Sequence, residues 1–338
     1  MKNDVNRQVV LKTRPTGIPQ AEHFELVERP LPAPGDGQVL VRNLYLSVDP
    51  AMRGWVNAVA NYSEPVPLGG VMRAATLGRI VETRHAHWKA GDVVTGMFGW
   101  QDFAAVDVAD IQVKVSEDGT PLSAWLGVLG TNGLTAYFGL LDAGQPKPGE
   151  TVVVSTAAGA VGSCVGQIAK IKGCRTVGIA GGMEKTALCR DAFGFDAAID
   201  YKQNDLDAAL AAACPKGIDV YFDNTAGKIS DAVLKHLNVH ARVVICGTAS
   251  VASWDPIPLG PRVERHLLVK RARMQGILIF DYADRLDEGR ADLARWVREG
   301  KMRYREDILD GIERAPDAIA GLYRGENLGK RLIKIAAP

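Results

Sequence analysis

A short glycine-containing segment between two apolar runs is the part of this sequence that most clearly indicates chemistry. Residues 151–155 read Thr-Val-Val-Val-Ser, which suits a strand buried on both faces, and residues 157–162 read Ala-Ala-Gly-Ala-Val-Gly. A helical pattern follows at residues 163–172, and a second strand-like run lies at residues 176–180. Strand, glycine turn, helix and strand in this order are typical of a unit that binds a dinucleotide.

The physical basis is that a pyrophosphate binds the uncovered N–H groups at a helix N-terminus, where the helix dipole favours negative charge. Side chains beside it must be small, and Ala157 stands where the usual fingerprint has its first glycine. Such a pattern alone also fits an ordinary turn between a strand and a helix. With strands on both sides, we predict that the pyrophosphate is held by Gly159, Ala160, Val161 and Gly162.

The end of the second strand indicates which dinucleotide is bound. NAD sites usually carry an acidic residue there that binds the ribose hydroxyls, but residues 180–183 read Ala-Gly-Gly-Met. The missing carboxylate and the nearby cation of Lys185 favour the additional 2′-phosphate of NADP. The alternative is that Lys185 is a solvated lysine in the first turn of a helix.

Length and composition describe an ordinary globular protein with no bias towards a charged partner. The chain has 338 residues, enough for two domains, and 47% of them are hydrophobic and 23% charged. Its 40 Lys and Arg residues nearly balance 39 Asp and Glu residues, so we expect neither nucleic acid nor a membrane as a partner. No apolar run reaches transmembrane length and the N-terminus is polar, which predicts a cytoplasmic protein.

The cysteines and histidines do not form a disulfide or metal-binding pattern. The five cysteines are odd in number, include no C-x-x-C pair and begin only at Cys164. We therefore expect reduced, buried thiols and no bound metal. His85 and His87 are expected to lie in a surface turn.

Two kinds of pattern divide the chain into two predicted domains. The first 125 residues contain many short strand-like runs separated by Gly and Pro, which is typical of a β-barrel. Pro50 is expected to open a short helix there, with Asp49 as its N-cap. Helices and strands then alternate to about residue 300, as in a doubly wound parallel sheet. We predict an α/β protein with a barrel-like domain at 1–125 and 301–338 and a nucleotide-binding domain at 126–300.

Motifs along nearly the whole chain resemble one known family. They are Ser47-Val48-Asp49-Pro50, Gly133-Leu134-Thr135-Ala136-Tyr137, residues 157–162, Gly194-Phe195-Asp196, Tyr221-Phe222-Asp223-Asn224, Cys246-Gly247 and Glu326-Asn327-Leu328-Gly329-Lys330. In this order the chain resembles the zinc-independent medium-chain dehydrogenases/reductases, and among them the NADPH-dependent alkenal/one oxidoreductases. This resemblance implies a GroES-like β-barrel domain, a Rossmann domain that binds NADP (NADPH), and a homodimer formed through the edge of the nucleotide-domain sheet.

The resemblance also implies roles for residues outside the glycine turn. Lys185 would bind the 2′-phosphate, and Tyr201 would lie at the adenosine phosphate end. Asn224 and Asn327 match asparagines that hydrogen-bond the cofactor. Two segments match the lining of the nicotinamide half of the cofactor site. The first begins with Cys246, Gly247 and Thr248 and continues to residue 252. The second consists of Ile277, Leu278 and Ile279. As alternatives, Tyr201 is a partly buried aromatic residue and Asn224 a turn residue at a strand end.

Two positions depart from the family on the substrate side. Family members often carry a tyrosine after Asp-Pro, where this chain has Ala51, and another near the substrate carbonyl, where it has Ala252, with Trp254 nearby. Neither alanine can donate a side-chain hydrogen bond. Tyr62, at a family position near the substrate mouth, is the candidate catalytic donor. The ribose hydroxyl of the cofactor is a second candidate donor. The alternative for Tyr62 is an aromatic residue of a loop without a catalytic role. The small side chains predict a bulkier or more apolar substrate.

The function that the resemblance implies is reduction of the C=C bond of an α,β-unsaturated aldehyde or ketone. Hydride passes from NADPH to the β-carbon, charge develops on the carbonyl oxygen, and a proton reaches the α-carbon. Two other functions stay open. An NADPH:quinone reductase needs the same cofactor and a flat acceptor, and a non-enzymatic NADPH-binding redox sensor would not need the missing tyrosines.

Overall fold

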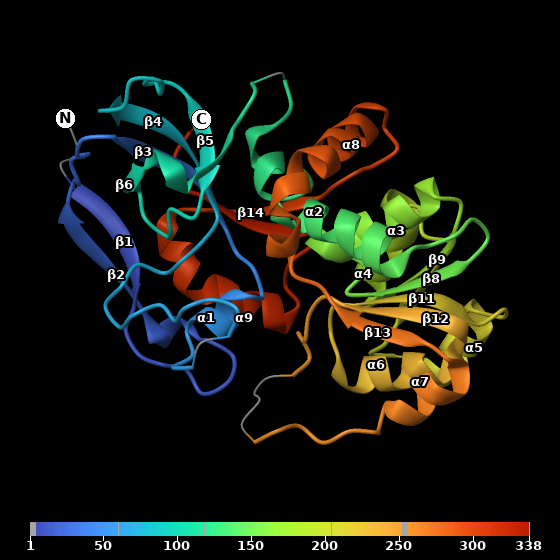
Figure 1. The fold of residues 1–338 in the computed structure, drawn as a ribbon. Helices are drawn as coiled ribbons and strands as arrows, with labels where there is room; N and C mark the ends of the chain where they lie inside the picture. Colours follow the sequence, from blue (N-terminus) through green and yellow to red (C-terminus); the bar gives the residue numbers. More distant parts are fainter. Residues whose placement is uncertain (1–4, 60, 118, 204, 252–255, 338) are drawn as a thin grey trace. The chain divides into compact units, whose positions relative to one another are not determined.

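The strand-like runs after residue 150 form one parallel six-stranded sheet in the computed structural model, which describes residues 5–59, 61–117, 119–203, 205–251 and 256–337. Its strands are β8 (Thr151–Ser155), β9 (Arg175–Ala180), β10 (Ala197–Asp200), β11 (Ile218–Asp223), β12 (Leu237–Ile245) and β13 (Arg273–Gly276). They lie in the order β10-β9-β8-β11-β12-β13 (Figure 1). This sheet belongs to a unit that spans Gly127–Arg305.

Helices cover both faces of this sheet. Figure 1 shows α2 and α3 on one face and α6 and α7 on the other, which confirms the predicted doubly wound sheet. The helices of the unit are α2 (Thr131–Phe138), α3 (Ala160–Ile171), α4 (Met183–Ala187), α5 (Leu206–Ala213), α6 (Gly227–Val233), α7 (Glu264–Lys270) and α8 (Leu286–Arg298). Short π-helical segments follow α2 (Gly139–Gly144) and α4 (Leu188–Ala192), and 3₁₀ segments follow α6 (Leu234–His236) and precede α8 (Ile279–Arg285).

The strand order reverses between β8 and β11. All five residues of β8 are buried, as expected for a strand with helices on both faces. In the register of β8 and β11, Val154 pairs with Phe222, so the carboxyl ends of the two strands meet. In sheets of this type, ligands bind at the carboxyl ends of the strands where the order reverses.

The other unit consists of Met1–Leu126 and Glu306–Pro338 and is mostly β-structure. Its strands are β1 (Val5–Leu11), β2 (Phe24–Pro30), β3 (Gln38–Ser47), β4 (Thr76–Thr83), β5 (Val93–Gly96), β6 (Phe103–Asp107), β7 (Ile111–Lys114), β14 (Glu306–Asp310) and β15 (Lys330–Lys334). Helices α1 (Met52–Trp55) and α9 (Ala315–Arg324) and short 3₁₀ segments connect them, and these segments are Ala21–His23, Val108–Asp110, Leu122–Leu126 and Ile312–Arg314.

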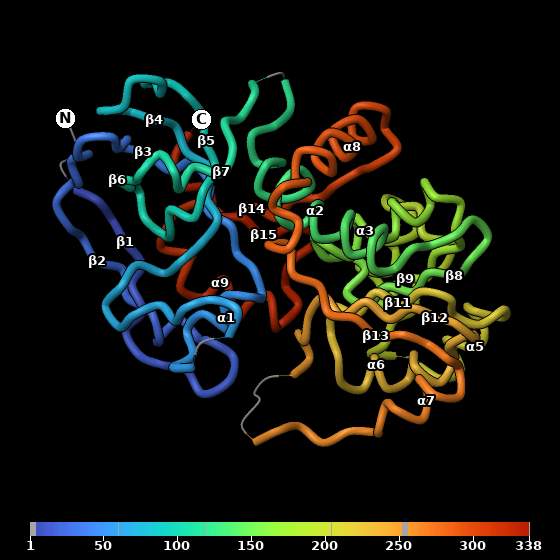
Figure 2. Tube along the Cα trace, viewed as in Figure 1, coloured from blue at the N-terminus to red at the C-terminus, as the bar shows by residue number. Residues whose placement is uncertain are grey.

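The C-terminal segment completes the main sheet of this second unit. The sheet has the order β14-β15-β3-β4-β5-β7, with β6 also paired to β3, while β1 and β2 form a separate pair. β15 is antiparallel to β3, and Leu332 lies opposite Ser47. Figure 2 shows β14 and β15 at the red end of the colour scale within the unit that also holds the blue N-terminal strands.

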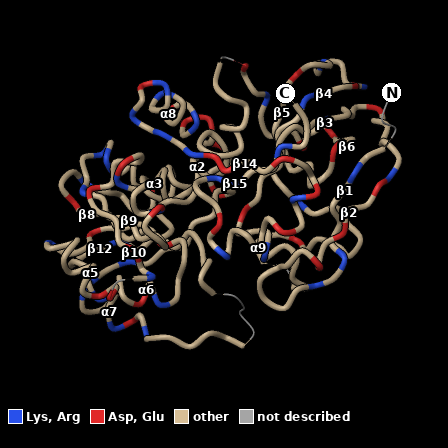
Figure 3. The backbone as a smooth tube through the Cα atoms, turned by 180° about the vertical axis from the view of Figure 1, so that it is seen from behind, with Lys and Arg blue, Asp and Glu red and all other residues tan. Residues whose placement is uncertain are grey.

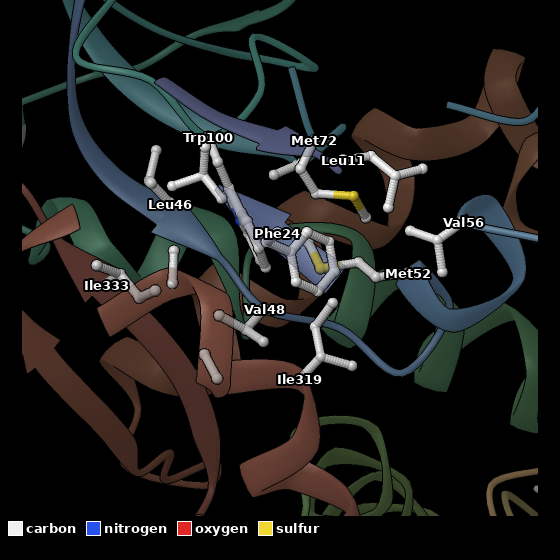
Figure 4. Packing of buried hydrophobic residues seen from close by; sticks show 14 of the residues in the cluster. Leu11, Phe24, Leu46, Val48, Met52, Val56, Met72, Trp100, Ile319 and Ile333 are labelled. Atoms are coloured by element: carbon white, nitrogen blue, oxygen red, sulfur yellow. The ribbon is translucent and has the colours of Figure 1, made fainter. Parts of the chain in front are cut away.

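One hydrophobic cluster packs α1 and α9 against the strands of this unit (Figure 4). Met52 and Val56 from the α1 region and Ile319 from α9 are fully buried in it. Trp100 is also fully buried, and its indole N–H donates to the carbonyl oxygen of Ser47 at 3.2 Å. The cluster therefore packs the end of β3, α1 and α9 together.

The predicted N-cap of the first helix is wrong. α1 begins at Met52, its N-cap is Ala51, and no side chain caps it. The Asp49 carboxylate instead forms an ion pair with Lys330, at 2.6 Å. Only 5% of the Lys330 side chain is exposed, so its charge requires a charged partner. The N–H groups at the start of α1 can hydrogen-bond water instead of a capping side chain.

Charged residues of both signs are interspersed along the backbone of both units (Figure 3). This agrees with the formal net charge of +1. Among the described residues, no helix is both long enough and apolar enough to span a bilayer.

Candidate cofactor and substrate sites

The glycine segment after β8 leads into the start of α3, where the sequence predicts the pyrophosphate site. Gly159 is the extended N-cap of α3, no side chain caps this end, and the first turn carries no acidic residue. A Cβ atom added at Gly162 would lie 2.3 Å from the carbonyl oxygen of Thr156, so only glycine fits there. At Gly159 the added Cβ would lie 3.0 Å from the Thr156 side chain. The backbone N–H groups of the first turn of α3 have no capping side chain and lie at the positive end of the helix dipole, so they fit a pyrophosphate.

A tyrosine and a lysine lie against the tip of β9. A Cβ atom added at Gly181 would lie 3.0 Å from Cε1 of Tyr201 and 3.0 Å from Cε of Lys202. Sequence reasoning named Tyr201 for this region but missed Lys202. Lys185 lies on α4, which begins two residues after Gly181. Lys202 could have been found from the sequence, because it forms a Tyr-Lys pair with Tyr201 directly after the third strand of the sheet.

Asp200 holds this corner together and was also missed. Its carboxylate oxygen Oδ1 accepts hydrogen bonds from the backbone N–H of Gly182 at 2.8 Å and of Lys202 at 3.0 Å. Gly182 has a φ of +96°, a conformation that favours glycine. The acid near this tip therefore comes from β10 rather than from β9, and it ties the turn after β9 to the turn after β10.

A buried carboxylate organises the carboxyl end of β11. Asp223 is fully buried and accepts hydrogen bonds from the hydroxyls of Tyr221 at 3.0 Å and Ser230 at 2.7 Å. It also accepts from the backbone N–H groups of Thr225 at 2.8 Å and Ala226 at 2.9 Å. Burial, and then the charge of Asp223, raise the pKa of Tyr221 well above its usual value, so this hydroxyl stays a donor. The network fixes the turn that carries Asn224.

Asn224 faces the end of β8. Its side-chain Nδ2 donates to the carbonyl oxygen of Ser155 at 2.7 Å, and its backbone N–H donates to the Ser155 hydroxyl at 2.8 Å. Both donors thus bridge the two strands at the point where the strand order reverses. Asn224 is therefore held at the edge of the sheet where the sequence predicts that it hydrogen-bonds the cofactor.

The predicted nicotinamide segments begin at the same edge of the sheet. The backbone N–H groups of Cys246 and Gly247 donate to the carbonyl oxygen of Asp223, at 2.8 and 3.1 Å. Ile277 N–H donates to Ile245 O at 3.1 Å, which places residues 277–279 directly after the neighbouring strand. Burial raises the pKa of the Cys246 thiol to about 12, so it is not a nucleophilic thiolate at neutral pH.

Ala252 and Trp254 lie outside the described residues, while Thr248, Leu278 and Ile279 lie in the segments that follow β12 and β13. Among the described residues, no group of three or more His, Cys, Asp or Glu side chains is placed to hold a metal ion. His85 accepts a hydrogen bond from the N–H of exposed His87 at 3.2 Å, as in a surface turn.

In the β-rich unit, a buried lysine joins the motif at residues 47–50 to the motif at residues 326–330. Nζ of Lys330 donates to Asp49 at 2.6 Å, to the Ser47 hydroxyl at 2.6 Å and to the carbonyl oxygen of Val48 at 3.2 Å. The Ser47 hydroxyl also hydrogen-bonds Asp49. All three ammonium donors are therefore used. Asn327, three residues earlier, donates to the carbonyl oxygen of Gly329 at 2.8 Å, which bends the segment before β15.

Tyr62 and Ala51 lie in the same β-rich unit as Lys330 and Asp49. The Tyr62 side chain is 46% exposed, and Ala51 packs beside the buried cluster around Met52. Tyr323, which sequence reasoning did not name, donates from its hydroxyl to the carbonyl oxygen of Pro50 at 3.1 Å.

Comparison with known proteins gives two matching family models. One is described as the N-terminal domain of oxidoreductase and matches residues 7–113. The other is described as zinc-binding dehydrogenase and matches residues 160–295.

The chain is also similar to characterised proteins over nearly its full length. It is 47% identical to an NADPH-dependent curcumin reductase of Escherichia coli, over 98% of this chain and 97% of that protein. It is 39% identical to a 2-alkenal reductase (NADP(+)-dependent) of Nicotiana tabacum, over 98% of both chains. The chain belongs to the medium-chain dehydrogenases/reductases. Within them it belongs to the zinc-independent NADP-dependent reductases.

A solved structure supports the fold and cofactor of this medium-chain reductase. The chain matches the crystal structure of CurA from Vibrio vulnificus in complex with NADPH, with a TM-score of 0.93 and 45% identity, over 98% of this chain and 100% of the CurA chain. The GroES-like and Rossmann parts predicted from the sequence are thereby confirmed, and so is the choice of NADP as cofactor.

Proposed function

We propose that this protein uses NADPH to reduce the C=C bond of α,β-unsaturated aldehydes and ketones, with hydride added at the β-carbon. The observation that carries the proposal is the phosphate cradle at Gly159 and Gly162, in a chain that matches NADPH-dependent curcumin and alkenal reductases over nearly its full length. The bound NADPH supplies the hydride, and the protein supplies the binding, the orientation and the hydrogen-bond donors.

We assign the cofactor residues as follows. The cradle from Gly159 through Ala160 and Val161 to Gly162 holds the pyrophosphate. Lys185, Tyr201 and Lys202 bind the adenosine ribose and its 2′-phosphate. The nicotinamide half and the adjoining ribose contact Asn224, Cys246, Gly247, Thr248, Ile277, Leu278, Ile279 and Asn327.

The two parts of the chain divide this work. The segments 1–125 and 301–338 form the substrate and catalytic domain, and residues 126–300 form the NADP-binding domain. Tyr62 in the first of these is a candidate donor to the substrate carbonyl. The sequence carries alanine at positions 51 and 252, where family members often carry tyrosine, and these small side chains favour a substrate that is bulkier or more apolar than small alkenals.

Enzyme assays with defined acceptors test the function. Purified protein and NADPH are mixed with non-2-enal, curcumin, acrolein or a quinone. Oxidation of NADPH is followed by the decrease in its absorbance, and the products are identified by mass spectrometry. We expect products two mass units heavier than the enals and enones, with acrolein the poorest of them. Faster turnover of quinones would indicate a quinone reductase, and NADPH binding without oxidation of any acceptor would indicate a sensor.

We further propose a cytoplasmic homodimer that forms through β13. This strand pairs with β12 and ends the sheet, so its outer edge offers backbone N–H and C=O groups to a second copy. Exposed apolar side chains lie near it on α7 and after β13, and they are Leu268, Val269, Leu278 and Phe280. Such side chains are typical of an interface.

Light scattering tests this assembly. We expect a mass near twice that of the 36.3 kDa chain, and a monomer for Leu268→Glu, because a buried glutamate at the interface would lack a partner. Exposed Val239→Glu is the control. A monomeric wild type would rule out the dimer.

A further inference from the structure

The glycine turn after β9 adopts a backbone conformation that its surroundings must hold. Gly182 is the N-cap of α4, with φ +96° and ψ 154°. Essentially only glycine adopts this region, and such conformations persist where neighbouring groups fix them. A Cβ atom added at Gly182 would meet nothing within 4 Å, so the backbone conformation rather than crowding requires glycine. Its carbonyl oxygen accepts a hydrogen bond from the N–H of Thr186 at 3.1 Å, so Gly182 also fixes the start of α4.

A buried carboxylate holds this turn. The Asp200 residue is only 7% exposed, and it lies opposite Ala180 in the register of β10 and β9, so the two strands end at the same level. Its Oδ1 atom accepts hydrogen bonds from the N–H of Gly182 at 2.8 Å and from the N–H of Lys202 at 3.0 Å. One oxygen atom therefore fixes both of the turns that follow these neighbouring strands.

The side chains that we assign to the adenosine ribose and its 2′-phosphate are carried by these two turns. Lys185 is the third residue of α4, which starts from the first turn. Tyr201 and Lys202 form the second turn, and their hydroxyl and Cε atoms lie 3.1 and 3.0 Å from the position of a Cβ atom added at Gly181. Both side chains are exposed, so their directions depend on the backbone that carries them.

We propose that Asp200 is a positioning residue that sets the preference for NADPH over NADH. It does so by holding the two turns in the arrangement that brings Lys185, Tyr201 and Lys202 to one phosphate. This inference rests on our assignment of these three residues in the proposed function. A site that is arranged beforehand loses less freedom when the ligand binds. NADH has no 2′-phosphate, so loss of this arrangement should weaken NADPH binding selectively.

The same hydrogen bonds explain how an acid can lie near an NADP site. In NAD sites an acid at the end of the second strand accepts hydrogen bonds from the ribose hydroxyls. Here the acid ends the neighbouring strand β10, and two backbone N–H groups occupy its Oδ1 atom. That oxygen is therefore used to shape the turns rather than to bind a ribose hydroxyl.

Coenzyme titrations of the full-length protein test the inference. NADPH and NADH are titrated separately without any acceptor, and Kd for each is measured by fluorescence, together with Tm of the free protein. The variants are Asp200→Ala and Asp200→Asn, with Asp196→Ala as the matched control. Asp196 lies just before β10 and accepts a hydrogen bond from the N–H of Thr176 at 2.8 Å, so it joins the same two strands at their opposite ends.

We expect Asp200→Ala to lower the ratio of Kd for NADH to Kd for NADPH by about tenfold or more, as for the loss of a charge-assisted hydrogen bond to phosphate. Asp200→Asn should keep the ratio within about threefold of wild type, because its amide oxygen can accept the same N–H groups. Asp196→Ala should lower Tm and leave the ratio unchanged. An unchanged ratio for Asp200→Ala would overturn the inference, and so would an equal loss for Asp196→Ala or for Asp200→Asn.

A second pair of variants tests the same turn without touching the carboxylate, and it decides the matter if Asp200→Ala does not fold. Gly182→Ala places a side chain where the backbone conformation disfavours one, so the ratio should fall about fivefold or more. Gly194→Ala is the control, because Gly194 also has a positive φ of +69° and an added Cβ there would meet nothing within 4 Å. A ratio that Gly182→Ala leaves at the wild-type value, or that Gly194→Ala lowers equally, would contradict the role of this turn.

The titrations also separate this inference from the proposed function. A wild type that binds NADH as tightly as NADPH would end both the assignment of the 2′-phosphate site and the role of Asp200. A wild type that prefers NADPH, with the same preference in Asp200→Ala, would end only the role of Asp200. Enone reduction does not enter the measurement, so a protein that reduces no enone would leave the result on Asp200 standing.

Discussion

At the scale of single residues, a few backbone-defined positions shape the site that we propose for the cofactor. Gly162 is glycine because a Cβ there would lie 2.3 Å from a carbonyl oxygen. Asp200 sits at the end of β10 because the amides of Gly182 and Lys202 require an acceptor. Together they leave Tyr201 and Lys202 lying over Gly181, where a phosphate on the adenosine ribose would need cations.

Removing either lysine charge should weaken binding of the phosphorylated coenzyme selectively. We expect Lys202→Gln and Lys185→Gln each to weaken NADPH binding by about tenfold, because a charge-assisted hydrogen bond to phosphate is lost, and to leave NADH binding unchanged. Fluorescence titration with both coenzymes measures this, and Lys216→Gln, an exposed lysine before β11, is the control. Equal weakening of NADH and NADPH binding would show that the lysines do not contact the 2′-phosphate.

At the scale of elements, two turns are held by buried charges rather than by local capping. Asp223 ties the turn after β11 to α6 through the hydroxyl of Ser230. Lys330 ties β15 to the end of β3 through Asp49. Each contact joins a strand end to a segment distant along the chain, and each positions residues that we assign to the cofactor or the substrate.

Loss of the buried lysine should destabilise the β-rich unit. We expect Lys330→Met to lower the free energy of unfolding by about 3 kcal/mol, because the partly buried Asp49 carboxylate loses its partner. Urea unfolding measures it. Lys334→Met, on the same strand but half-buried, should cost less than about 1 kcal/mol. A double variant with Asp49→Asn should recover part of the loss, and a cost equal to that of Lys334→Met would contradict the assignment.

At the scale of the whole molecule, buried thiols make the free energy of unfolding depend on pH. Burial raises the pKa values of Cys164, Cys189 and Cys246 to about 12, from 9.0 for an ordinary thiol. The unfolded chain releases these protons above pH 9, while the folded chain keeps them. Stability is therefore complete below about pH 9 and decreases as the pH rises towards 12.

This slope can be measured. We expect the free energy of unfolding to fall between pH 9 and 11 by about 1.4 kcal/mol per pH unit for each such thiol. Cys164→Ala should remove one such contribution to the slope. Denaturant unfolding at several pH values checks it, and the same slope for Cys164→Ala and wild type would contradict the buried, protonated state of that thiol.

The sequence by itself determined the parts of this protein that depend on local spacing. Short apolar runs alternating with helical patterns predicted the doubly wound sheet, and two glycines at fixed spacing predicted the tight turn at the start of α3. Periodicity and glycine placement act over a few residues, so they can be read without coordinates. The N-cap assigned to Asp49 failed because its true partner, Lys330, lies 281 residues away.

Only the tertiary structure decided which distant side chains meet. Lys202 reached the tip of β9 because β10 lies beside β9, and Asp223 became a shared acceptor because the turn after β11 folds back over its carboxylate. Tyr323 reached Pro50 because one hydrophobic cluster packs α9 against α1. Such contacts depend on how elements pack, and packing is set by burial of apolar area from the whole chain rather than by any local pattern.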